Sequence, residues 1–332
     1  ADTTIDLPRP RGASANLSKV PYLPGLDGMR ALAVAAVLVY HANPTWLPGG
    51  FLGVEVFFVI SGYLITLLLM AERERTGTVK IGAFWMRRAR RLLPALFLML
   101  FLLLTYTWMF RADELGKLRG DVIAALLYVS NWYQIWVGDG YTSTGDFAPL
   151  RHLWSLAVEE QFYLIWPVAM LFLLRRNGTR NLALTARWLV VAALAVTVLT
   201  ALVYHPGRIG DCSVNPEAYW MVGDRCISKV ETLYLSTITR SSGLLLGAAF
   251  AMLWRPMAIM RGPLRNAGRS LDVVALAGFV FLGVFVWTIH LVTPAGADPW
   301  LFRGGFLWTA LATLMMIAAV THSRTLTSRV LG

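Results

Sequence analysis

Apolar residues follow one another in long runs that are separated by short polar connections. A helix rises about 1.5 Å per residue, so roughly 20 apolar residues cross the 30 Å hydrocarbon core of a bilayer. Eight clear runs have such lengths, at 26–43, 51–70, 92–110, 154–174, 184–204, 234–254, 272–291 and 302–321. The pattern predicts an all-α, polytopic transmembrane helical bundle of about eight spans.

A ninth run, at 118–136, is weaker because it carries the polar residues Asp121, Ser130, Asn131 and Gln134. The distribution of positive charge decides how it is placed. The connection 71–91 holds seven basic residues, and the connections 175–187 and 255–269 are also rich in arginine. Such loops face the cytoplasm. The run 92–110 then leaves the cytoplasm and 154–174 returns to it, so we expect 118–136 to be a re-entrant or interfacial helix. If it did span, every later loop would change side.

Composition supports this class of protein. The chain has 332 residues, of which 57% are hydrophobic and 15% are charged, and its net charge is +11. In a membrane protein this charge indicates basic cytoplasmic loops rather than binding of nucleic acid. No glycine-rich phosphate loop and no Cys/His cluster with metal-ligand spacing is present in the sequence, so we expect no bound cofactor and no metal.

The chain divides into a tail and a membrane domain. Residues 1–25 are polar and contain proline, which predicts a flexible cytoplasmic N-terminal tail, and 26–332 form the transmembrane domain. The segment 205–231 falls outside the membrane and holds both cysteines, Cys212 and Cys226. An oxidising compartment favours a disulfide between them, with two free thiols as the alternative.

The first run carries two residues that are costly in lipid, Arg30 and His41. They are eleven residues apart, which is about 16 Å along a helix and close to three full turns, so they share one face. Arg30 has the alternative role of an interfacial residue that only sets topology. His41 has the alternative role of a helix-end residue bonded to a carbonyl.

Further ionisable residues fall within or beside other runs. Glu55, Glu159, Glu160 and Arg240 occupy the outer parts of their predicted spans. A carboxylate in an apolar span costs about 2.5–3.5 kcal/mol on insertion scales, so each one needs a partner or water. On the inner side, the third run is preceded by a cluster of four arginines, which could equally be a topology signal: Arg87, Arg88, Arg90 and Arg91.

The layout is therefore directional, with arginines inside and a histidine and carboxylates outside. A long phosphorylated donor that binds the inner arginines could place its reactive end beside the outer histidine. Coenzyme A has this form, because its phosphates lie at the nucleotide end and its pantetheine arm is long and uncharged.

Five stretches resemble the membrane-bound acyltransferase-3 family, whose members O-acylate extracytoplasmic carbohydrates. They are LDGMRALAVAAVLVYH, GFLGVEVFFVISGYLIT, FWMRRARRLLPA, LRHLWSLAVEEQFYLIWP and TITRSSGLLLGAAFA. The resemblance covers about 20–332. The family usually has ten spans, and many members continue into an SGNH hydrolase-like domain, so we expect this chain to be a C-terminally truncated membrane portion.

The resemblance implies roles for the residues singled out above. His41 would be catalytic, with Glu159 and Glu55 beside it, and Arg30 would act in the donor channel. The arginine cluster (Arg87, Arg88, Arg90 and Arg91) would bind acyl-CoA, which is a co-substrate rather than a bound cofactor. Arg240, Glu160 and Ser155 would contact the substrate or the oxyanion.

The implied activity is transfer of an acyl group, acetyl or succinyl, from cytoplasmic acyl-CoA to a polysaccharide or glycolipid of the bacterial cell envelope, in contact with membrane lipid. The expected location is the plasma membrane, with a cytoplasmic N-terminus. A transporter or flippase of a lipid-linked or acyl substrate remains the alternative, because charges within spans also mark transport pathways. A scaffold or sensor without chemistry is a third reading.

Overall fold

The computed structural model describes residues 22–138, 140, 147–177, 181–207, 212–293 and 296–332. Residues 1–21 of the predicted N-terminal tail lie outside the described residues. The remaining tail positions include Pro24, which begins the first helix instead of belonging to the tail. Proline is well suited to a first helical turn, because its missing N–H has no partner there in any case.

In the described residues the helices are, in chain order, α1 (Pro24–Ala42), α2 (Gly53–Thr76), α3 (Ile81–Phe110), α4 (Leu115–Leu126), α5 (Ser130–Val137), α6 (Leu153–Asn177), α7 (Leu182–Val203), α8 (Lys229–Leu235), α9 (Thr237–Leu253), α10 (Pro256–Ile259), α11 (Gly268–Thr288), α12 (Phe306–Val320) and α13 (Leu326–Val330). Short turns of helix are η1 (Gly50–Leu52), η2 (Ala112–Glu114), η3 (Pro216–Ala218), η4 (Pro263–Asn266) and η5 (Leu301–Gly305). The strands are β1 (Tyr219–Val222), β2 (Arg225–Ser228), β3 (Val292–Thr293) and β4 (Gly296–Ala297).

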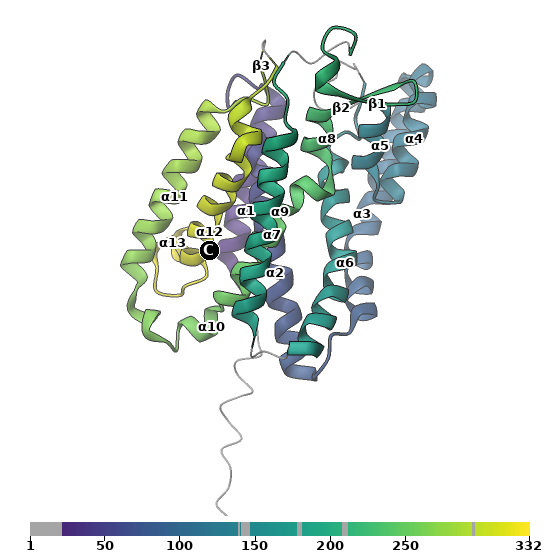
Figure 1. Ribbon diagram of the computed structural model, residues 1–332. Helices are drawn as coiled ribbons and strands as arrows, with labels where there is room; N and C mark the ends of the chain where they lie inside the picture. The colour runs from purple at the N-terminus through teal and green to yellow at the C-terminus, as the bar shows by residue number, and fades with distance from the viewer. Residues whose placement is uncertain (1–21, 139, 141–146, 178–180, 208–211, 294–295) are drawn as a thin grey trace, which may run out of the picture.

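The long helices run roughly side by side in one bundle (Figure 1). Within the described residues, eight helical segments are long and apolar enough to cross a membrane, and each coincides with one of the eight predicted runs. The all-α bundle predicted from the sequence is therefore confirmed. The largest difference in bounds is α3, which begins at Ile81 rather than at 92 and so carries the whole arginine cluster on a helix.

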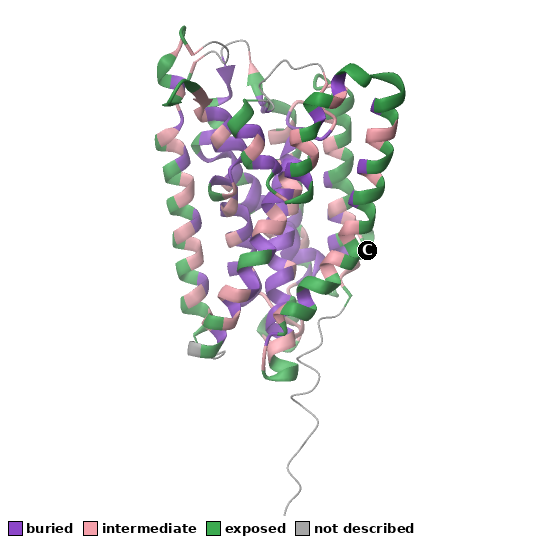
Figure 2. Cartoon of the chain, turned by 90° about the vertical axis from the view of Figure 1, so that its right-hand side faces the viewer, coloured by how far each residue is buried: buried purple, intermediate pink, exposed green. Residues whose placement is uncertain are grey.

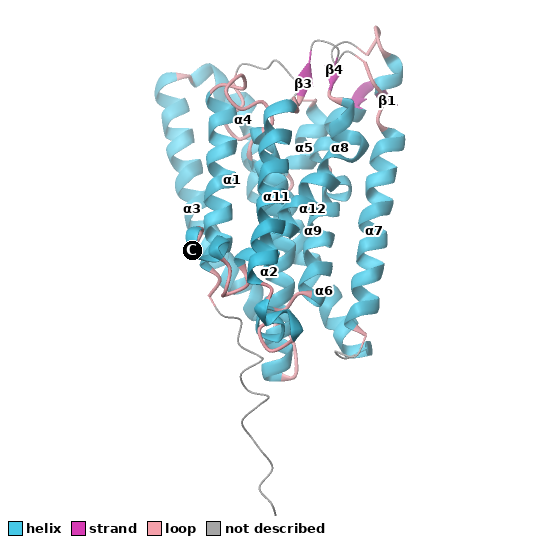
Figure 3. Ribbon diagram, turned by 90° about the vertical axis from the view of Figure 1, so that its left-hand side faces the viewer, coloured by secondary structure: helices cyan, strands magenta, loops and turns pink. Residues whose placement is uncertain are grey.

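The two ends of the bundle differ in character. Figure 3 shows the strands gathered at one end, which we call the strand end. The other end, which we call the arginine end, holds the connection between α2 and α3 and the basic residues around it. Helix α2 ends at its connection to α3, and only a short segment joins α1 to α2, so the two helices are antiparallel and α1 starts at the arginine end. It follows that Arg30 lies toward the arginine end and His41 toward the strand end.

The weak ninth run is two short helices, α4 and α5, rather than one. They break at Leu127–Val129, where Tyr128 has a φ of 54°. Neither is long enough to span a bilayer, and both lie at the strand end, so the expectation that this run does not span is confirmed. A residue with positive φ ends a helix because the left-handed region cannot continue it.

Polar residues hold this broken segment against its neighbours. Asn131 donates to the backbone carbonyl of Leu235 at 3.1 Å, just where α8 ends and α9 begins. Gln161 on α6 donates to Asn131 at 2.9 Å and to the carbonyl of Tyr128 at 2.8 Å. The interrupted helices leave carbonyls without intrahelical partners, and these amides satisfy them. Asn131, one of the polar residues that weaken the ninth run, therefore has a structural role.

At the strand end β1 and β2 form an antiparallel hairpin, and β3 pairs with β4. Cys212 and Cys226 are joined in a disulfide, which is the pairing that the sequence favours. The bridge ties the segment before the hairpin to β2. The β1–β2 hairpin lies beside α5 and α8 at this end of the bundle (Figure 1).

Helices α2 and α9 form the centre of the bundle, and Figure 2 shows buried residues concentrated there, with exposed positions on the outer helices. The two helices approach closely through glycine. A Cβ atom at Gly62 would lie 2.0 Å from the carbonyl oxygen of Leu244, and one at Gly247 would lie 2.1 Å from that of Val59. Small residues at such contacts let two backbones pack directly, as is common between membrane helices.

This packing predicts the effect of adding one methyl group. Gly247→Ala and Gly62→Ala should each destabilise the protein by about 1–3 kcal/mol, because the new Cβ meets backbone and cannot be relieved by a rotamer change. Thermal unfolding in detergent measures this. Gly283→Ala is the matched control, since a Cβ there meets nothing within 4 Å and alanine favours a helix. Equal melting temperatures for all three variants would contradict the close approach.

Candidate active site

One face of α1 carries a stripe of four residues, Arg30, Val34, Val37 and His41, at spacings of three and four. In a helix such positions lie above one another. Arg30 is the one of the four nearest the arginine end. It forms an ion pair with Asp27 at 3.3 Å, and its side chain stays 27% exposed. His41 lies in the last turn of α1 and is exposed at the strand end. The sequence correctly placed the two costly residues on one face.

The imidazole of His41 is oriented by its own helix. Its Nδ1 lies 2.8 Å from the carbonyl oxygen of Val37. A carbonyl can only accept a hydrogen bond, so Nδ1 carries the proton and the neutral ring has its lone pair on Nε2. The sequence analysis gave a bond from a helix-end histidine to a carbonyl as the alternative role of His41, and the structure contains that bond. The bond fixes the ring and leaves its other nitrogen as the one that can take up a proton.

A groove of about 280 Å³ lies beside this stripe, between α1, α2 and the start of α6. Most of its wall is apolar. The lining residues are Val34, Val37 and Leu38 from α1, Val54, Phe57 and Phe58 from α2, and His152, Ser155, Leu156 and Glu159 from the start of α6. Arg30 and His41 lie one turn beyond the α1 residues of the groove, at its two ends. A ligand with a long uncharged arm fits such a groove, because the arm would contact the apolar wall and its two ends would meet Arg30 and His41.

Glu159 is the carboxylate of this groove. It accepts a hydrogen bond of 2.6 Å from Ser61 on α2. Arg30 and Arg88 both lie within electrostatic range of it. A half-buried carboxylate is thereby stabilised by a hydroxyl and by nearby positive charge, as an ionisable group in a membrane span must be.

The predicted arginine cluster divides into different environments. Arg88 turns inward, where it binds Glu160 at 2.8 Å and lies 3.6 Å from the centre of the Tyr163 ring. Arg87 is exposed and lies 3.7 Å from Glu72. Arg90 and Arg91 are exposed on α3. Arg88 and Glu160 therefore lie at the same depth and join α3 to α6, so the predicted separation of an inner Arg88 from an outer Glu160 was wrong. The outward arginines are the ones accessible to a ligand.

Glu55 and Arg240 form a separate, fully buried pair. Their closest atoms are 3.1 Å apart, and the side chains are 0% and 1% exposed. Four aromatic rings surround the guanidinium, the nearest being Phe306 at 3.8 Å: Phe58, Trp154, Tyr234 and Phe306. Glycine at 243 makes room for the carboxylate, because a Cβ there would lie 2.1 Å from a Glu55 oxygen.

Arg240 is not among the residues that line the groove. Phe58 lies between them, with one side on the groove and its ring 5.4 Å from the guanidinium. Nε and Nη1 of Arg240 have no hydrogen-bond partner among the described residues. A substrate in the groove could contact Arg240, as predicted, only if Phe58 moved aside. Glu55 pairs with Arg240 and so also lies behind Phe58, away from the groove.

Sequence reasoning overlooked residues that the structure brings to the groove. His152 and Ser61 are the clearest cases. His152 stood inside a quoted motif, one residue before an apolar run, and sorting by depth would have placed it level with His41. Ser61 carries no such signal, because a serine in a span is common and its partner is 98 residues away.

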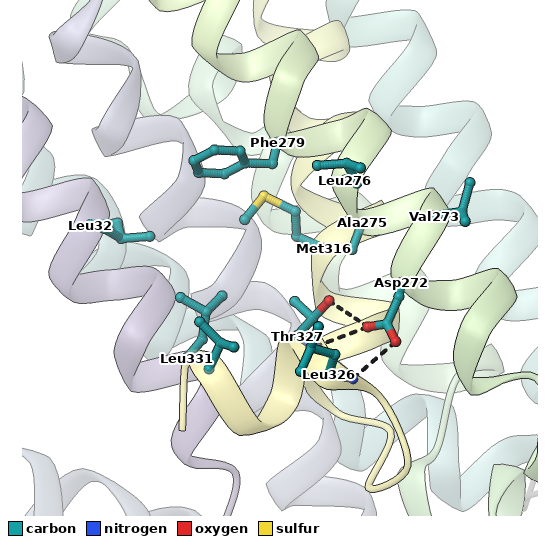
Figure 4. A pocket seen from close by; sticks show the side chains of 11 residues that line it. Leu32, Asp272, Val273, Ala275, Leu276, Phe279, Met316, Leu326, Thr327 and Leu331 are labelled. Atoms are coloured by element: carbon teal, nitrogen blue, oxygen red, sulfur yellow. Dashed lines mark hydrogen bonds between the residues drawn. The ribbon is translucent and has the colours of Figure 1, made fainter.

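Two larger grooves lie elsewhere on the bundle and are apolar. One runs between α1, α11, α12 and α13 (Figure 4). Its single carboxylate, Asp272, accepts hydrogen bonds from the backbone of Leu326 and Thr327 and from the Thr327 hydroxyl, all at 2.7–2.9 Å. Asp272 thus caps the start of α13. The only carboxylate of this groove is therefore already hydrogen-bonded by α13, whereas the α1–α2–α6 groove is lined by His152, Ser155 and Glu159.

Comparison with known proteins identifies the family of the chain. A family described as an acyltransferase domain matches residues 23–332. The O-acetyltransferase OatA of Staphylococcus aureus strain NCTC 8325 / PS 47 is 37% identical over 311 residues, which are 94% of this chain and 47% of OatA. SACOL0978 of strain COL, provisionally named an O-acetyltransferase, is 38% identical over 307 residues, or 92% and 46%. The chain spans about half the length of these relatives. No solved structure matches.

The buried pair makes a prediction about stability. Glu55→Gln or Arg240→Met alone leaves one buried charge without its partner and should cost about 3–5 kcal/mol. The double variant Glu55→Leu/Arg240→Met removes both charges and should be more stable than either single variant. Thermal unfolding in detergent tests this.

Glu74→Gln is the control, because it breaks the partly exposed Arg255–Glu74 pair of 2.6 Å and should cost at most about 1 kcal/mol. If the Glu55 and Arg240 variants unfold no earlier than Glu74→Gln, the buried pair does not stabilise the centre of the bundle.

Proposed function

Because the chain belongs to the acyltransferase-3 family, we propose that it moves an acyl group from acyl-CoA to a hydroxyl group of an extracytoplasmic glycan of the cell envelope. The observation that supports this most directly is the groove between α1, α2 and α6, which has Arg30 at one end and His41 at the other. Acetyl is the preferred acyl group, because the named relatives are O-acetyltransferases.

The proposed chemistry follows from the tautomer of His41. The oxygen of the acceptor hydroxyl attacks the thioester carbonyl carbon, and its proton passes to Nε2 of His41. The new C–O bond gives a tetrahedral oxyanion. When this collapses, the C–S bond breaks, and the leaving sulfur takes the proton back from the imidazolium. The products are the ester and free coenzyme A, with His41 neutral again.

Ser155 is better placed than Arg240 to stabilise the oxyanion. Its hydroxyl group belongs to a residue that lines the groove, where it donates to the carbonyl oxygen of His152 at 3.2 Å. That bond is long, so little is lost when the hydroxyl turns to a developing negative charge. Arg240 acts from behind Phe58, where its positive charge and its pairing with Glu55 fix the wall of the groove.

The donor enters from the arginine end. Arg30 holds its present partner, Asp27, at 3.3 Å in a partly exposed pair, which is weak enough to be exchanged for a phosphate. Arg90 and Arg91 are exposed on α3 and can meet the nucleotide end. Arg88 stays in its ion pair with Glu160 and positions α3 against α6 instead of contacting phosphate.

This orientation assigns sidedness to the multi-pass protein. The arginine end and the N-terminus face the cytoplasm, where acyl-CoA is available, and the strand end with its disulfide faces outward. The acceptor then approaches His41 from outside. An SGNH domain that takes part in later steps is compatible with the greater length of the named relatives.

Removal of the imidazole tests the proposed base. His41→Ala should lower kcat for acyl transfer by about 10²–10⁴-fold while acyl-CoA binding is retained, because the ring takes the proton but does not hold the donor phosphates. Transfer from acetyl-CoA to an N-acetylglucosamine trisaccharide, followed by mass spectrometry, measures the rate. Wild-type turnover by folded His41→Ala protein would remove His41 from the mechanism.

The arginines should affect the donor instead. Arg30→Ala, and the pair Arg90→Ala/Arg91→Ala, should weaken coenzyme A binding by about 1.5–3 kcal/mol for each charged hydrogen bond lost. Calorimetric titration with coenzyme A measures this. Arg269→Ala, an exposed arginine on α11 at the same end, is the matched control and should bind as wild type does. Equal affinities for all of these variants would reduce the arginines to a topology signal.

A further inference from the structure

We propose that His152 is the acceptor-binding residue of this site, and that its imidazole accepts a hydrogen bond from a hydroxyl group of the glycan and so positions the sugar against His41. The inference rests on the proposed transferase function and adds a recognition residue to it. The expected ligand is a sugar ring with two neighbouring hydroxyl groups, one for each histidine.

His152 is placed where an acceptor must arrive. It lines the groove from the residue just before α6, and it is exposed at the strand end, as His41 is. The two imidazoles come from different elements, and they lie close enough for the charge of His41 to act on His152. An extracytoplasmic hydroxyl group that reaches His41 therefore passes beside His152.

The hydrogen bonding of His152 leaves it an acceptor. Its ring bonds to the backbone of Pro149. Proline has no N–H, so the partner is the carbonyl oxygen and the ring nitrogen must be the donor. The other nitrogen of a neutral imidazole then carries a lone pair. His41 bonds the carbonyl oxygen of Val37 in the same way, so the neutral form of each ring has one nitrogen that carries a lone pair.

The His152 ring holds a proton less readily than a free imidazole does. The neighbouring protein removes hydration from the His152 ring and so lowers its pKa, and positive charge on His41 lowers that pKa further. His152 therefore stays neutral beside His41. A neutral imidazole keeps its lone pair throughout the step, so it can hold the acceptor hydroxyl by a hydrogen bond. A base, in contrast, gives up its lone pair when it takes the proton.

The test separates binding from chemistry. Initial rates are measured for detergent-purified protein with acetyl-CoA at saturation and an N-acetylglucosamine trisaccharide as the varied acceptor. His152→Ala should raise the KM for the trisaccharide on the order of 3- to 10-fold, the effect of one lost neutral hydrogen bond, and should change kcat by less than about 2-fold. His152→Gln, which retains an acceptor oxygen, should restore most of the lost affinity.

Two further variants control for packing. His152→Phe keeps the ring without the acceptor and should behave as His152→Ala, which also covers the case in which the alanine variant folds poorly. His290→Ala should leave kcat and KM unchanged. That exposed histidine follows α11, outside the groove, and its ring bonds the carbonyl oxygen of Thr288. A melting temperature for each variant shows whether it is folded.

The outcomes are distinct. Wild-type KM in folded His152→Ala and His152→Phe proteins overturns the inference and leaves the transferase function intact. Loss of kcat at constant KM in the alanine and glutamine variants alike also overturns it, since His152 would then be the base. If the wild type transfers no acetyl group, the proposed function fails, and this inference fails with it.

Discussion

The structure depends on one constraint, which is that every charge placed inside the bundle must find its partner there. Lipid offers no hydrogen bonds, so each span that carries an ionisable residue has to meet another span at the same depth. Glu55 meets Arg240, Glu160 meets Arg88, and Glu159 meets Ser61. These contacts join α2 to α9, α3 to α6, and α2 to α6. The expensive residues thus determine which helices are neighbours.

The same contacts explain why the groove lies beside α1. Helices α2 and α6 are held by buried polar contacts on several sides, including the hydrogen bond from Trp166 to Thr66 at 2.8 Å. Helix α1 has only four buried residues among its 19, so most of its surface faces away from the core. The groove lies between the fixed helices α2 and α6 on one side and α1 on the other. The stripe from Arg30 to His41 faces that space, so the two costly residues of α1 have water or ligand within reach.

The sequence alone predicts what is local or periodic. Span number and approximate bounds follow from hydrophobic runs, and the common face of Arg30 and His41 follows from helical geometry. Partner choice does not follow, because Glu55 and Arg240 are brought together by packing at glycine. The break at Tyr128 was also missed, since its carbonyl is satisfied by the amide of Gln161 on α6, 33 residues away in the chain.

An arginine and a histidine eleven residues apart in one apolar helix therefore have a single physical explanation. Each lies at an end of a groove whose middle is apolar, so a ligand must be polar at both ends and uncharged between them. Arg30 remains partly exposed in a weak pair, while Arg88, deeper in the bundle, is bound to Glu160. In the proposed function Arg30 exchanges its partner for a phosphate more easily than Arg88 does, because its pair is longer and the carboxylate of Asp27 is more exposed than that of Glu160. The distribution of ion-pair strength, rather than the number of arginines, thus separates the arginines that we propose for the donor from those that hold the helices together.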